Sequence, residues 1–286
     1  MKIKVFQKGF NFSQDGPGNR LVYHLQGCNM ACMWCSNPEG INEKGSIMMS
    51  LDTIDEACLK GAIIDGVFDA KLCKGCDRPC LENKDTSLSL SYQEYEFDDL
   101  IDETISCKPM FFSSGGVTFT GGEPTLNLPL LTRLLKELKA QDINTAIETN
   151  ATHPDLMSII DYVDYLIMDL KHYNKEKHRN ATKVSSALIK RNIEQISQIK
   201  PFLLRIPLIG GFNDDLTDAQ GFIDHLENVN KENIKVEFLQ FHEYGKHKWA
   251  QCGLTYAMTG NEYVSNERVK EFRQAFENAG FKVVNT

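Results

Sequence analysis

The sequence lacks an apolar run long enough to cross a membrane, and no apolar stretch follows its first residues, MKIKVFQKGF. A spanning helix needs about eighteen apolar residues, and a secretory signal needs an apolar segment behind a basic start. We therefore expect neither a membrane span nor an export signal. An excess of positive charge is also lacking, because 31 Lys and Arg stand against 39 Asp and Glu, a net charge of −8. This balance argues against a protein that binds the phosphate backbone of nucleic acids.

Internal repeats and low-complexity tracts are absent as well. A chain of 286 residues fits two domains or one α/β barrel. At this length it should bury roughly three quarters of its unfolded surface, so disulfides are not needed for stability. Nine cysteines without an export signal instead indicate metal or redox chemistry in a reducing compartment. We therefore expect a cytoplasmic protein.

Six short apolar runs, rich in branched and aromatic residues, are spaced along the chain. Runs of this kind, bounded by Gly, Asn, His or charged residues, are typical of buried strands. They are RLVYHLQGC (20–28), GVTFTGG (116–122), NTAIETN (144–150), DYLIMDLK (164–171), PFLLRIPLI (201–209) and IKVEFLQFH (234–242). We expect each run to form one strand.

Helical patterns lie between some of these strands. LPLLTRLLKELKAQ (128–141) repeats leucine at helical spacing, and AQGFIDHLENV (219–229) and VKEFRQAFENAG (269–280) also indicate helices. The last of them stops at a glycine, as helices often do. Alternation of strands and helices predicts parallel strands joined by right-handed crossovers, in an open sheet or a barrel. The interval from 40 to 107, with five cysteines and the acidic stretch YQEYEFDDLIDE, interrupts this rhythm and indicates an insertion.

CNMACMWC (28–35) spaces three cysteines as C-x3-C-x2-C. A structural zinc site closes four ligands around the ion, and the nearby candidate for the fourth, His24, fits a packed or surface position in the first strand better. A [4Fe–4S] cluster also takes four ligands, normally cysteines, so three thiolates would leave one iron open. An open position is the mark of a catalytic metal site.

A second motif, GGVTFTGGEPTL, carries Gly121, Gly122 and Glu123 at the end of the second predicted strand. Glycines let backbone approach a ligand closely, and a carboxylate beside them can accept a hydrogen bond from an ammonium group. Alone, the three residues are equally compatible with an ordinary turn. Their position one strand after the cysteines makes a joint site the better interpretation.

With Trp34 directly before the third cysteine, the two motifs resemble the radical S-adenosylmethionine (radical SAM) superfamily. A closer resemblance, to the activating enzymes of glycyl radical enzymes such as pyruvate formate-lyase, covers nearly the whole chain outside 40–107. It is carried, in order and spacing, by DGPGNR (15–20), GCNMACMWCSNPE (27–39), SSGGVTFTGGEPTL (113–126), IETN (147–150), MDLK (168–171), RIPLIGGFNDD (205–215) and FHEYGKHKW (241–249).

This resemblance implies a partial (β/α)6 TIM-like barrel over 1–40 and 108–286, with a small ferredoxin-like domain inserted at 41–107. It implies that an open iron binds the amino and carboxylate groups of S-adenosylmethionine. Reductive cleavage then gives a 5′-deoxyadenosyl radical, which takes a hydrogen atom from a glycine of a partner enzyme. A glycyl radical enzyme as partner, flavodoxin or ferredoxin as electron donor and a monomeric state are further implications.

The resemblance also implies roles for single residues. Cys28, Cys32 and Cys35 would ligate the cluster, Lys171 suits the methionine carboxylate, and Asp169 suits a hydroxyl or a cation. Glu148 and Thr149 occupy the place where relatives hold a monovalent cation, although Glu is one methylene longer than the Asp used there. Asp15 is the expected contact to the incoming glycine loop. The expected cofactor-binding residues are Trp34, Ser36, Gly121, Gly122, Glu123, Glu148, Thr149, Asn150, Asp169, Leu170, Lys171, Arg205 and His242.

The insertion departs from the two-cluster ferredoxin pattern found in some relatives. CLKGAI (58–63) resembles the tail of one cluster-binding run, and CKGCDRPC (73–80) resembles the head of a second. In such ferredoxins the fourth cysteine of one run ligates the cluster of the other. Cys58 is therefore grouped with Cys73, Cys76 and Cys80 as one auxiliary [4Fe–4S] site, for which zinc is the alternative. Cys107 and Cys252 are expected to be ordinary thiols.

Two other functions remain open from the sequence. One is a radical SAM enzyme acting on another peptide or a small molecule. The other is an iron–sulfur protein that transfers electrons without catalysis. Cleavage of S-adenosylmethionine under reducing conditions would separate the second from both enzymes.

Overall fold

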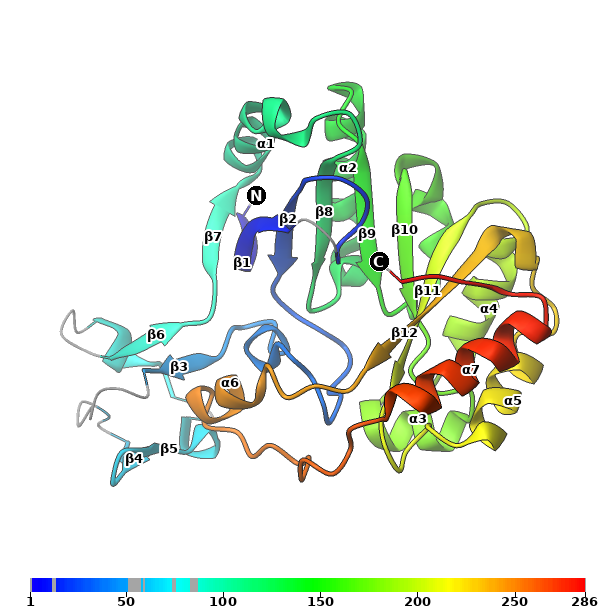
Figure 1. The fold of residues 1–286 in the computed structure, drawn as a ribbon. Coiled ribbons are helices and arrows are strands. Elements are labelled where there is room, and N and C mark those ends of the chain that lie inside the picture. Colours follow the sequence, from blue (N-terminus) through cyan, green and yellow to red (C-terminus); the bar gives the residue numbers. More distant parts are fainter. Residues whose placement is uncertain are drawn as a thin grey trace.

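The computed structural model describes residues 2–11, 14–50, 58, 60–73, 76–82 and 87–285. Its centre is one nine-stranded sheet with the order β13-β12-β11-β10-β9-β8-β2-β1-β7, curved and covered by helices on its outer face (Figure 1). Its strands are β1 (Lys2–Asn11), β2 (Arg20–Leu25), β7 (Gln93–Glu96), β8 (Gly116–Gly121), β9 (Thr145–Thr149), β10 (Tyr165–Asp169), β11 (Phe202–Leu208), β12 (Ile234–Gln240) and β13 (Lys282–Val283).

All six predicted strands are present, as β2, β8, β9, β10, β11 and β12, and each pairs in parallel with the next. Their near-continuous apolar sequences fit this arrangement, because parallel strands are covered on both faces. The structure adds β1 and β7, which pair antiparallel beside β2, and a short β13 beside β12. The prediction of a partial α/β barrel with parallel strands is confirmed.

The three predicted helices are confirmed as α2 (Leu128–Ala140), α5 (Leu216–His225) and α7 (Asn266–Asn278). The start of α2 is fixed by Asn127, whose side chain accepts a hydrogen bond from the backbone N–H of Leu130 at 3.2 Å. Further helices are α1 (Phe97–Ser106), α3 (Lys175–Thr182), α4 (Ala187–Ser197) and α6 (Lys246–Gln251). None of the helices in the described part of the chain is long and apolar enough to cross a membrane.

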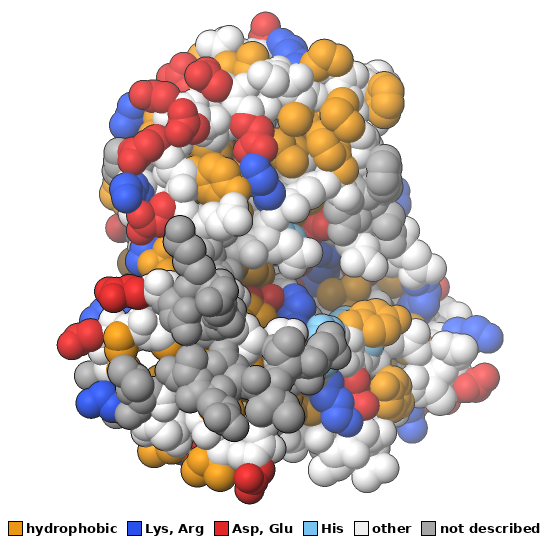
Figure 2. Space-filling model, turned by 90° about the vertical axis from the view of Figure 1, so that its left-hand side faces the viewer, with side chains coloured by type: hydrophobic (Ala, Val, Ile, Leu, Met, Phe, Trp, Pro, Cys, Tyr) orange, Lys and Arg blue, Asp and Glu red, His pale blue; other side chains and the backbone are white. Residues whose placement is uncertain are grey.

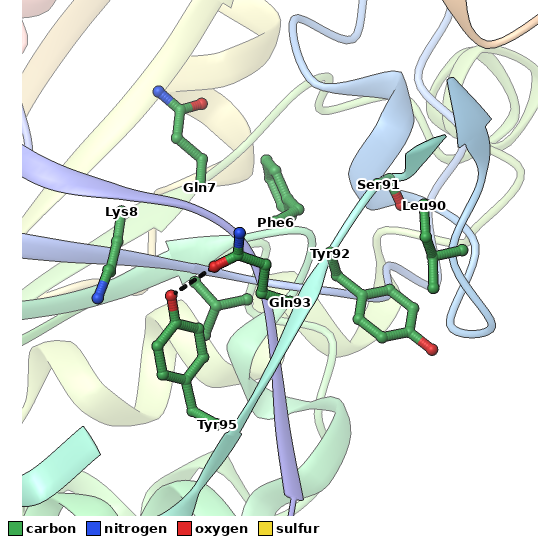
Figure 3. Close-up of a pocket in the computed structure, with 9 residues that line it drawn as sticks. Phe6, Gln7, Lys8, Leu90, Ser91, Tyr92, Gln93 and Tyr95 are labelled. Carbon is green, nitrogen blue, oxygen red and sulfur yellow. Dashed lines mark hydrogen bonds between the residues drawn. The ribbon is translucent and has the colours of Figure 1, made fainter. Parts of the chain in front are cut away.

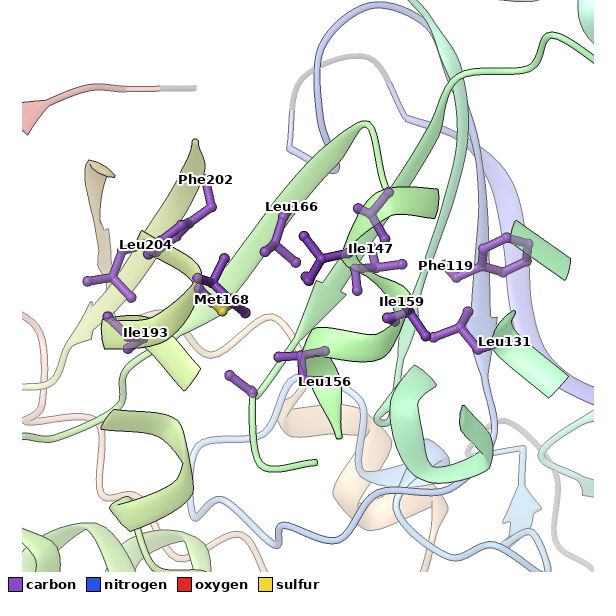
Figure 4. Packing of buried hydrophobic residues seen from close by; sticks show 14 of the residues in the cluster. Phe119, Leu131, Ile147, Leu156, Ile159, Leu166, Met168, Ile193, Phe202 and Leu204 are labelled. Atoms are coloured by element: carbon purple, nitrogen blue, oxygen red, sulfur yellow. The ribbon is translucent and has the colours of Figure 1, made fainter. Parts of the chain in front are cut away.

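The main core lies between the sheet and these helices. Figure 4 shows Phe119, Ile147, Leu166 and Leu204 of the strands packed with Leu131 of α2, Ile193 of α4 and residues of the 3-10 segment Leu156–Tyr162. The leucine repeat of α2 is responsible for part of this contact: Leu131, Leu134, Leu135 and Leu138 are all fully buried. This packing fixes the strand ends from which the site residues extend.

The insertion forms two small antiparallel pairs, β3 (Ile47–Met49) with β6 (Leu88–Leu90) and β4 (Ile63–Ile64) with β5 (Val67–Phe68). Its ends meet, because Ser91 N donates to Ser46 O at 2.9 Å and Ser46 N donates to Ser91 Oγ at 3.0 Å. The following β7 and α1 belong to the main sheet and the main core instead. We therefore propose residues 41–92, rather than 41–107, as the inserted unit, and its ferredoxin-like character stays a prediction.

Candidate active site and auxiliary cysteine site

The cysteine loop (residues 28–35) begins directly after β2, at the carboxyl end of the parallel strands. Gly27 and Cys28 donate their N–H groups to Gly40 O and Ile41 O at 2.8 and 2.9 Å, which closes the base of the loop. Near its tip, Ala31 N donates to Thr182 O at 2.9 Å, at the end of α3. The loop is therefore held at its base and at its tip.

The three thiols lie close enough to influence one another electrostatically. Burial raises the pKa of Cys35 to about 12 and holds those of Cys28 and Cys32 above the usual value. Met30 N lies 3.4 Å from Cys28 Sγ, and the Lys171 ammonium favours the thiolate of Cys32. Among the described residues, no group of three or more His, Cys, Asp or Glu side chains is placed to hold a single metal ion. Three partly desolvated sulfurs with nearby N–H and ammonium donors fit the anionic ligands of an iron–sulfur cluster.

His24 does not join the three cysteines. Its ring lies against Phe6, with centroids 5.5 Å apart, inside the β2 region. Burial lowers its pKa to about 4, and the charge of Lys248 acts in the same direction. A neutral and packed His24 therefore does not supply the fourth ligand that a zinc site at the three cysteines would need.

The glycines of the second motif bring β8 into close contact with the cysteine loop. Gly122 N donates to Leu25 O at 2.9 Å, and Glu123 N donates to Gly27 O at 2.7 Å. A Cβ on Gly122 would lie 1.9 Å from Gly27 O, so any larger residue would separate the two segments. The glycines are therefore required for contact between the motifs themselves.

The Glu123 side chain ties the end of β8 to the end of β9. It accepts hydrogen bonds from Thr125 N at 3.0 Å, from Thr149 Oγ1 at 2.7 Å and from Asn150 N at 2.7 Å. Burial raises its pKa, and these donors act in the opposite direction. Asn150 in turn donates to Asn29 Oδ1 at 2.8 Å, with the same Nδ2 4.0 Å from Cys28 Sγ. A continuous polar chain thus leads from Glu123 to the cysteine loop.

Asp169 ends β10, and Lys171 lies two residues further along the chain. The two form an ion pair, with Lys171 Nζ 2.9 Å from Asp169 Oδ2. Burial lowers the pKa of Lys171, but Asp169 and the nearby cysteine thiols outweigh it and the net pKa is raised. Leu170 between them is buried, and its N–H donates to Arg205 O at 2.9 Å. A permanently charged ammonium group therefore lies beside the cysteine loop.

Arg205, one of the expected cofactor-binding residues, lies in the middle of β11, inside the barrel. Its Nη1 is 2.7 Å from Glu148 Oε1 and its Nε is 2.8 Å from Glu237 Oε2. A further bond reaches the backbone oxygen of Gln14. The guanidinium is thus enclosed by two carboxylates and a carbonyl, and Thr120 Oγ1 donates to the other oxygen of Glu148 at 3.2 Å.

Asp15 belongs to the same interior cluster. Burial and the neighbouring Glu148 carboxylate raise the pKa of Asp15 to about 7, although Arg205 acts in the opposite direction. Its side chain is almost fully buried, at the start of the loop before β2. The structure therefore places Asp15 next to Glu148 and Arg205, within the barrel.

Arg20 was not identified from the sequence as a site residue, although it ends the DGPGNR motif. It is fully buried, and its guanidinium donates to Thr118 Oγ1 at 2.7 Å, Val117 O at 2.7 Å and Pro17 O at 3.2 Å. Thr118 Oγ1 donates onward to Asp15 O at 2.7 Å. Arg20 therefore holds the backbone on both sides of the loop that carries Asp15.

The remaining predicted residues lie around the far side of the cysteine loop. The Trp34 ring lies 5.2 Å from that of Phe212, and the Ser36 backbone packs against Gly245. His242 follows β12, and its ring stacks on that of Tyr244 at 4.3 Å. Burial lowers the pKa of His242. This histidine is therefore favoured in its neutral form at the mouth of the barrel.

The auxiliary cysteine set is brought together in the insertion. Burial raises the pKa of Cys73, and Cys58, Cys76 and Cys80 act on it in the same direction through their proximity. Cys58, Cys73 and Cys80 pack against a small separate core formed by Ile47, Met49, Ala62, Phe68 and Leu88. Cys107 instead lies near Glu103 and Lys8, in the main body. The grouping of Cys58 across the gap with Cys73, Cys76 and Cys80 is thus sterically reasonable.

A cavity of about 330 Å³ lies at the junction of β1 and β7 and is lined by Phe6, Lys8, Tyr92 and Tyr95 among others (Figure 3). Its lining, within the described part of the chain, includes none of the predicted site residues. Figure 2 shows the side of the molecule that lies on the left in Figure 1, with acidic side chains gathered on its upper left. The residues that line the β1–β7 cavity are thus different from the predicted site residues.

Comparison with known proteins agrees with this geometry. The family described as the radical SAM superfamily matches residues 70–223, and a 4Fe-4S single cluster domain matches residues 14–68. The 4-hydroxyphenylacetate decarboxylase activating enzyme of Clostridioides difficile is 31% identical, over 93% of this chain and 90% of its own length. The pyruvate formate-lyase-activating enzyme of Staphylococcus epidermidis is 30% identical, over 90% and 88%. A solved domain of the pyruvate-formate lyase-activating enzyme from Bacteroides vulgatus superposes with a TM-score of 0.50 at 25% identity, over 59% of this chain and 98% of that domain.

Proposed function

Because this chain belongs to the radical SAM superfamily, and within it to the activating enzymes of glycyl radical enzymes, we propose that Cys28, Cys32 and Cys35 ligate a [4Fe–4S] cluster whose fourth iron binds S-adenosylmethionine. The observation that carries this proposal is the contact between the two motifs, with Glu123 N 2.7 Å from Gly27 O. It brings the glycine-rich end of β8 against the segment that carries the three thiols.

A reduced cluster held by Cys28, Cys32 and Cys35 would supply the one electron that cleaves the sulfonium of S-adenosylmethionine to methionine and a 5′-deoxyadenosyl radical, which would take a hydrogen atom from a glycine of the partner enzyme. The products are 5′-deoxyadenosine and a glycyl radical. The electron comes from an external reductant, for which we propose flavodoxin or ferredoxin. This step needs no protein acid or base, so the chain's own residues act by binding and orientation.

Lys171 is the proposed partner of the methionine carboxylate. Its ammonium lies 2.9 Å from the Asp169 carboxylate, and Asp169 and the nearby thiols raise its pKa against the effect of burial, so the group stays charged. Glu123 keeps the Gly121–Gly122 backbone in place through its bonds to β9, which supports a role for that backbone beside the amino group. We propose that His242 and Trp34 also lie against the cofactor.

The cluster of Asp15, Glu148 and Arg205 inside the barrel bears on the proposed site of a monovalent cation. Glu148 already faces a positive group, because Arg205 lies 2.7 Å from it. We propose that this guanidinium supplies the positive charge assigned to a monovalent cation by the resemblance. Asp15, whose loop is fixed by Arg20, is the proposed contact to the partner's glycine loop.

For the insertion we propose one auxiliary [4Fe–4S] cluster on Cys58, Cys73, Cys76 and Cys80, with an electron-transferring or structural role. All nine cysteines are free thiols, as expected in a reducing compartment, which supports a cytoplasmic location. We also propose that the protein acts as a monomer on its partner.

The test is anaerobic reconstitution, reduction with dithionite, and addition of S-adenosylmethionine with candidate glycyl radical enzymes. Methionine and 5′-deoxyadenosine should form, and the right partner should acquire a doublet electron paramagnetic resonance signal. Cys32→Ala should abolish cleavage, whereas the matched control Cys107→Ala should retain it. Retained cleavage in Cys32→Ala would contradict the cluster assignment. Cleavage without a radical in any partner would instead favour a peptide or small-molecule substrate.

A further inference from the structure

Helix α6 and the turn after it (Cys252 and Gly253) lie between the two cysteine sets. Figure 1 shows α6 beside the inserted strands, below the main sheet. Cys252 in the turn is almost fully buried. Helix α6 contacts the 3-10 turn Pro38–Gly40 beside the cysteine loop and strand β5 of the insertion.

On the side of the cysteine loop, α6 binds the segment Cys35–Glu39. Trp249 Nε1 donates to Cys35 O at 2.9 Å. Lys248 Nζ donates to Asn37 Oδ1 at 2.9 Å and to Glu39 Oε1 at 2.6 Å. Glu39 is buried, and its other carboxylate oxygen has no hydrogen-bond partner among the described residues, so Lys248 is important for compensating its charge.

On the side of the insertion, the contact is made by Gly253. Its carbonyl oxygen accepts a hydrogen bond from Ala70 N at 3.1 Å. Its φ of +64° favours glycine, and an added Cβ would lie 2.6 Å from both Ala70 N and Phe68 Cδ1. Phe68 belongs to the small core against which Cys58, Cys73 and Cys80 pack. The backbone of Gly253 therefore packs against Phe68 and Ala70 with no room for a side chain.

We propose that α6 couples the two sites: Lys248 and Trp249 position the Cys35–Glu39 segment, and Gly253 makes that position depend on the packing of the auxiliary cysteine set. The proposal rests on the proposed function, since it takes both sets as cluster sites. Phe68 lies against Gly253, which follows the end of α6, and Trp249 within α6 is hydrogen-bonded to Cys35 O. By reciprocity, loading of the auxiliary set stabilises the cysteine loop, and loading of the loop stabilises the insertion.

The test compares two glycine substitutions that keep all nine cysteines. Gly253→Ala forces the helix end away from Phe68 and Ala70, whereas the matched control Gly66→Ala, also at positive φ (+75°), adds a methyl group with no atom within 4 Å. Both are made in the full chain, and amide hydrogen exchange is followed in peptides covering 28–41. Gly253→Ala should speed exchange there by about tenfold, and Gly66→Ala by less than about twofold.

Two further variants separate positioning from general destabilisation. Lys248→Met should speed exchange in 28–41 in the same way, and Lys248→Arg should restore it, while exchange in the distant helix α4 (187–197) stays at the wild-type rate in both. Cys73→Ala should lose about half of the iron and also loosen 28–41, although it touches no residue of that loop.

The proposal is overturned if Gly253→Ala and Gly66→Ala behave alike, or if exchange rises in 60–73 and stays unchanged in 28–41. Iron and zinc analysis of the wild type keeps this result apart from the proposed function. Absence of a cluster from the auxiliary set would contradict the auxiliary-cluster part of the proposed function. The two glycine variants would still decide whether α6 links segment 28–41 to segment 60–73.

Discussion

Arg205 on β11 and Glu148 on β9 form an ion pair inside the barrel, with Nη1 2.7 Å from Oε1. The other side of the guanidinium is bound by Glu237 on β12, at 2.8 Å from Nε. Three strands are therefore joined by one buried charge. Burial lowers the pKa of Arg205, but Glu148 and Glu237 outweigh this effect, so the guanidinium stays charged.

Removal of this guanidinium should destabilise the barrel strongly. Arg205→Met leaves two carboxylates buried without their partner, and we expect a loss of about 3–5 kcal/mol in the free energy of unfolding. The triple variant that adds Glu148→Gln and Glu237→Gln should recover part of this loss, because the uncompensated charges are gone. Urea denaturation of the two proteins measures the difference. Equal stability of Arg205→Met and the wild type would contradict the importance of the pair.

Removal of the Asp15 carboxyl should stabilise the protein at alkaline pH, whereas removal of the Arg205 guanidinium should destabilise it. Its pKa is raised to about 7, so the folded state holds its proton more tightly than the unfolded state, where the value is near 3.8. The stability it contributes is complete below about pH 4 and is lost as the pH rises through 7. Asp15→Asn should therefore stabilise the protein at pH 8, by roughly 1–3 kcal/mol, and change little at pH 4.5.

The control for this change is Asp102→Asn on the exposed face of α1. It removes the same charge from a solvated position and should be nearly neutral at both pH values. If Asp15→Asn and Asp102→Asn gave equal unfolding midpoints at pH 8, the carboxyl pair of Asp15 and Glu148 would not be strained.

His172 makes stability fall at acidic pH. Burial lowers its pKa to about 4, helped by Lys177, and its ring is enclosed by those of Tyr173, Phe212 and Phe222. A depressed value means that its contribution is complete above about pH 6.5 and is lost as the pH falls through 4. His172→Phe should therefore flatten the fall in unfolding free energy between pH 7 and pH 4.5, by the order of 2 kcal/mol. The exposed His247, replaced by Asn, should leave the slope as in the wild type.

The cysteine sets predict the iron content. Reconstituted protein should hold about eight irons and eight sulfides, from two [4Fe–4S] clusters. Cys58→Ala should degrade only the auxiliary cluster and leave about four irons, with S-adenosylmethionine cleavage still measurable. Cys107→Ala should keep all eight, because Cys107 lies by Glu103 and Lys8. One zinc per chain together with about four irons would refute the auxiliary cluster and leave the Cys28–Cys35 site intact.

The strands that carry the site were predictable because each is a compact apolar run. β1 and β7 were not, since KIKVFQKGFN and QEYE alternate with charged residues and become strands only by pairing with each other and with β2. The short polar helix α3 was missed for a similar reason: its sequence is mostly polar, and its importance lies in the hydrogen bond that Thr182 O accepts from Ala31 N of the cysteine loop.

Within the site, the motifs identified the residues and the tertiary pairing decided their surroundings. The spacing of Cys28, Cys32 and Cys35 is local, and it carried the metal hypothesis without further information. The surroundings of Arg205, Glu237 and Arg20 depend on strands that are far apart in sequence. No local pattern therefore places Arg205 between two carboxylates, or Arg20 beneath the loop of Asp15.

The hydrogen bonds between Ser46 and Ser91 determine how the inserted segment can be altered. Because these two residues are hydrogen-bonded to each other, everything between them leaves the main body and returns to it at one point. A segment with adjacent ends can be lengthened, shortened or exchanged at little cost to the host fold. The length of this segment and its number of cysteine ligands can therefore change without a change in the path of the main sheet, except at its contact with Gly253.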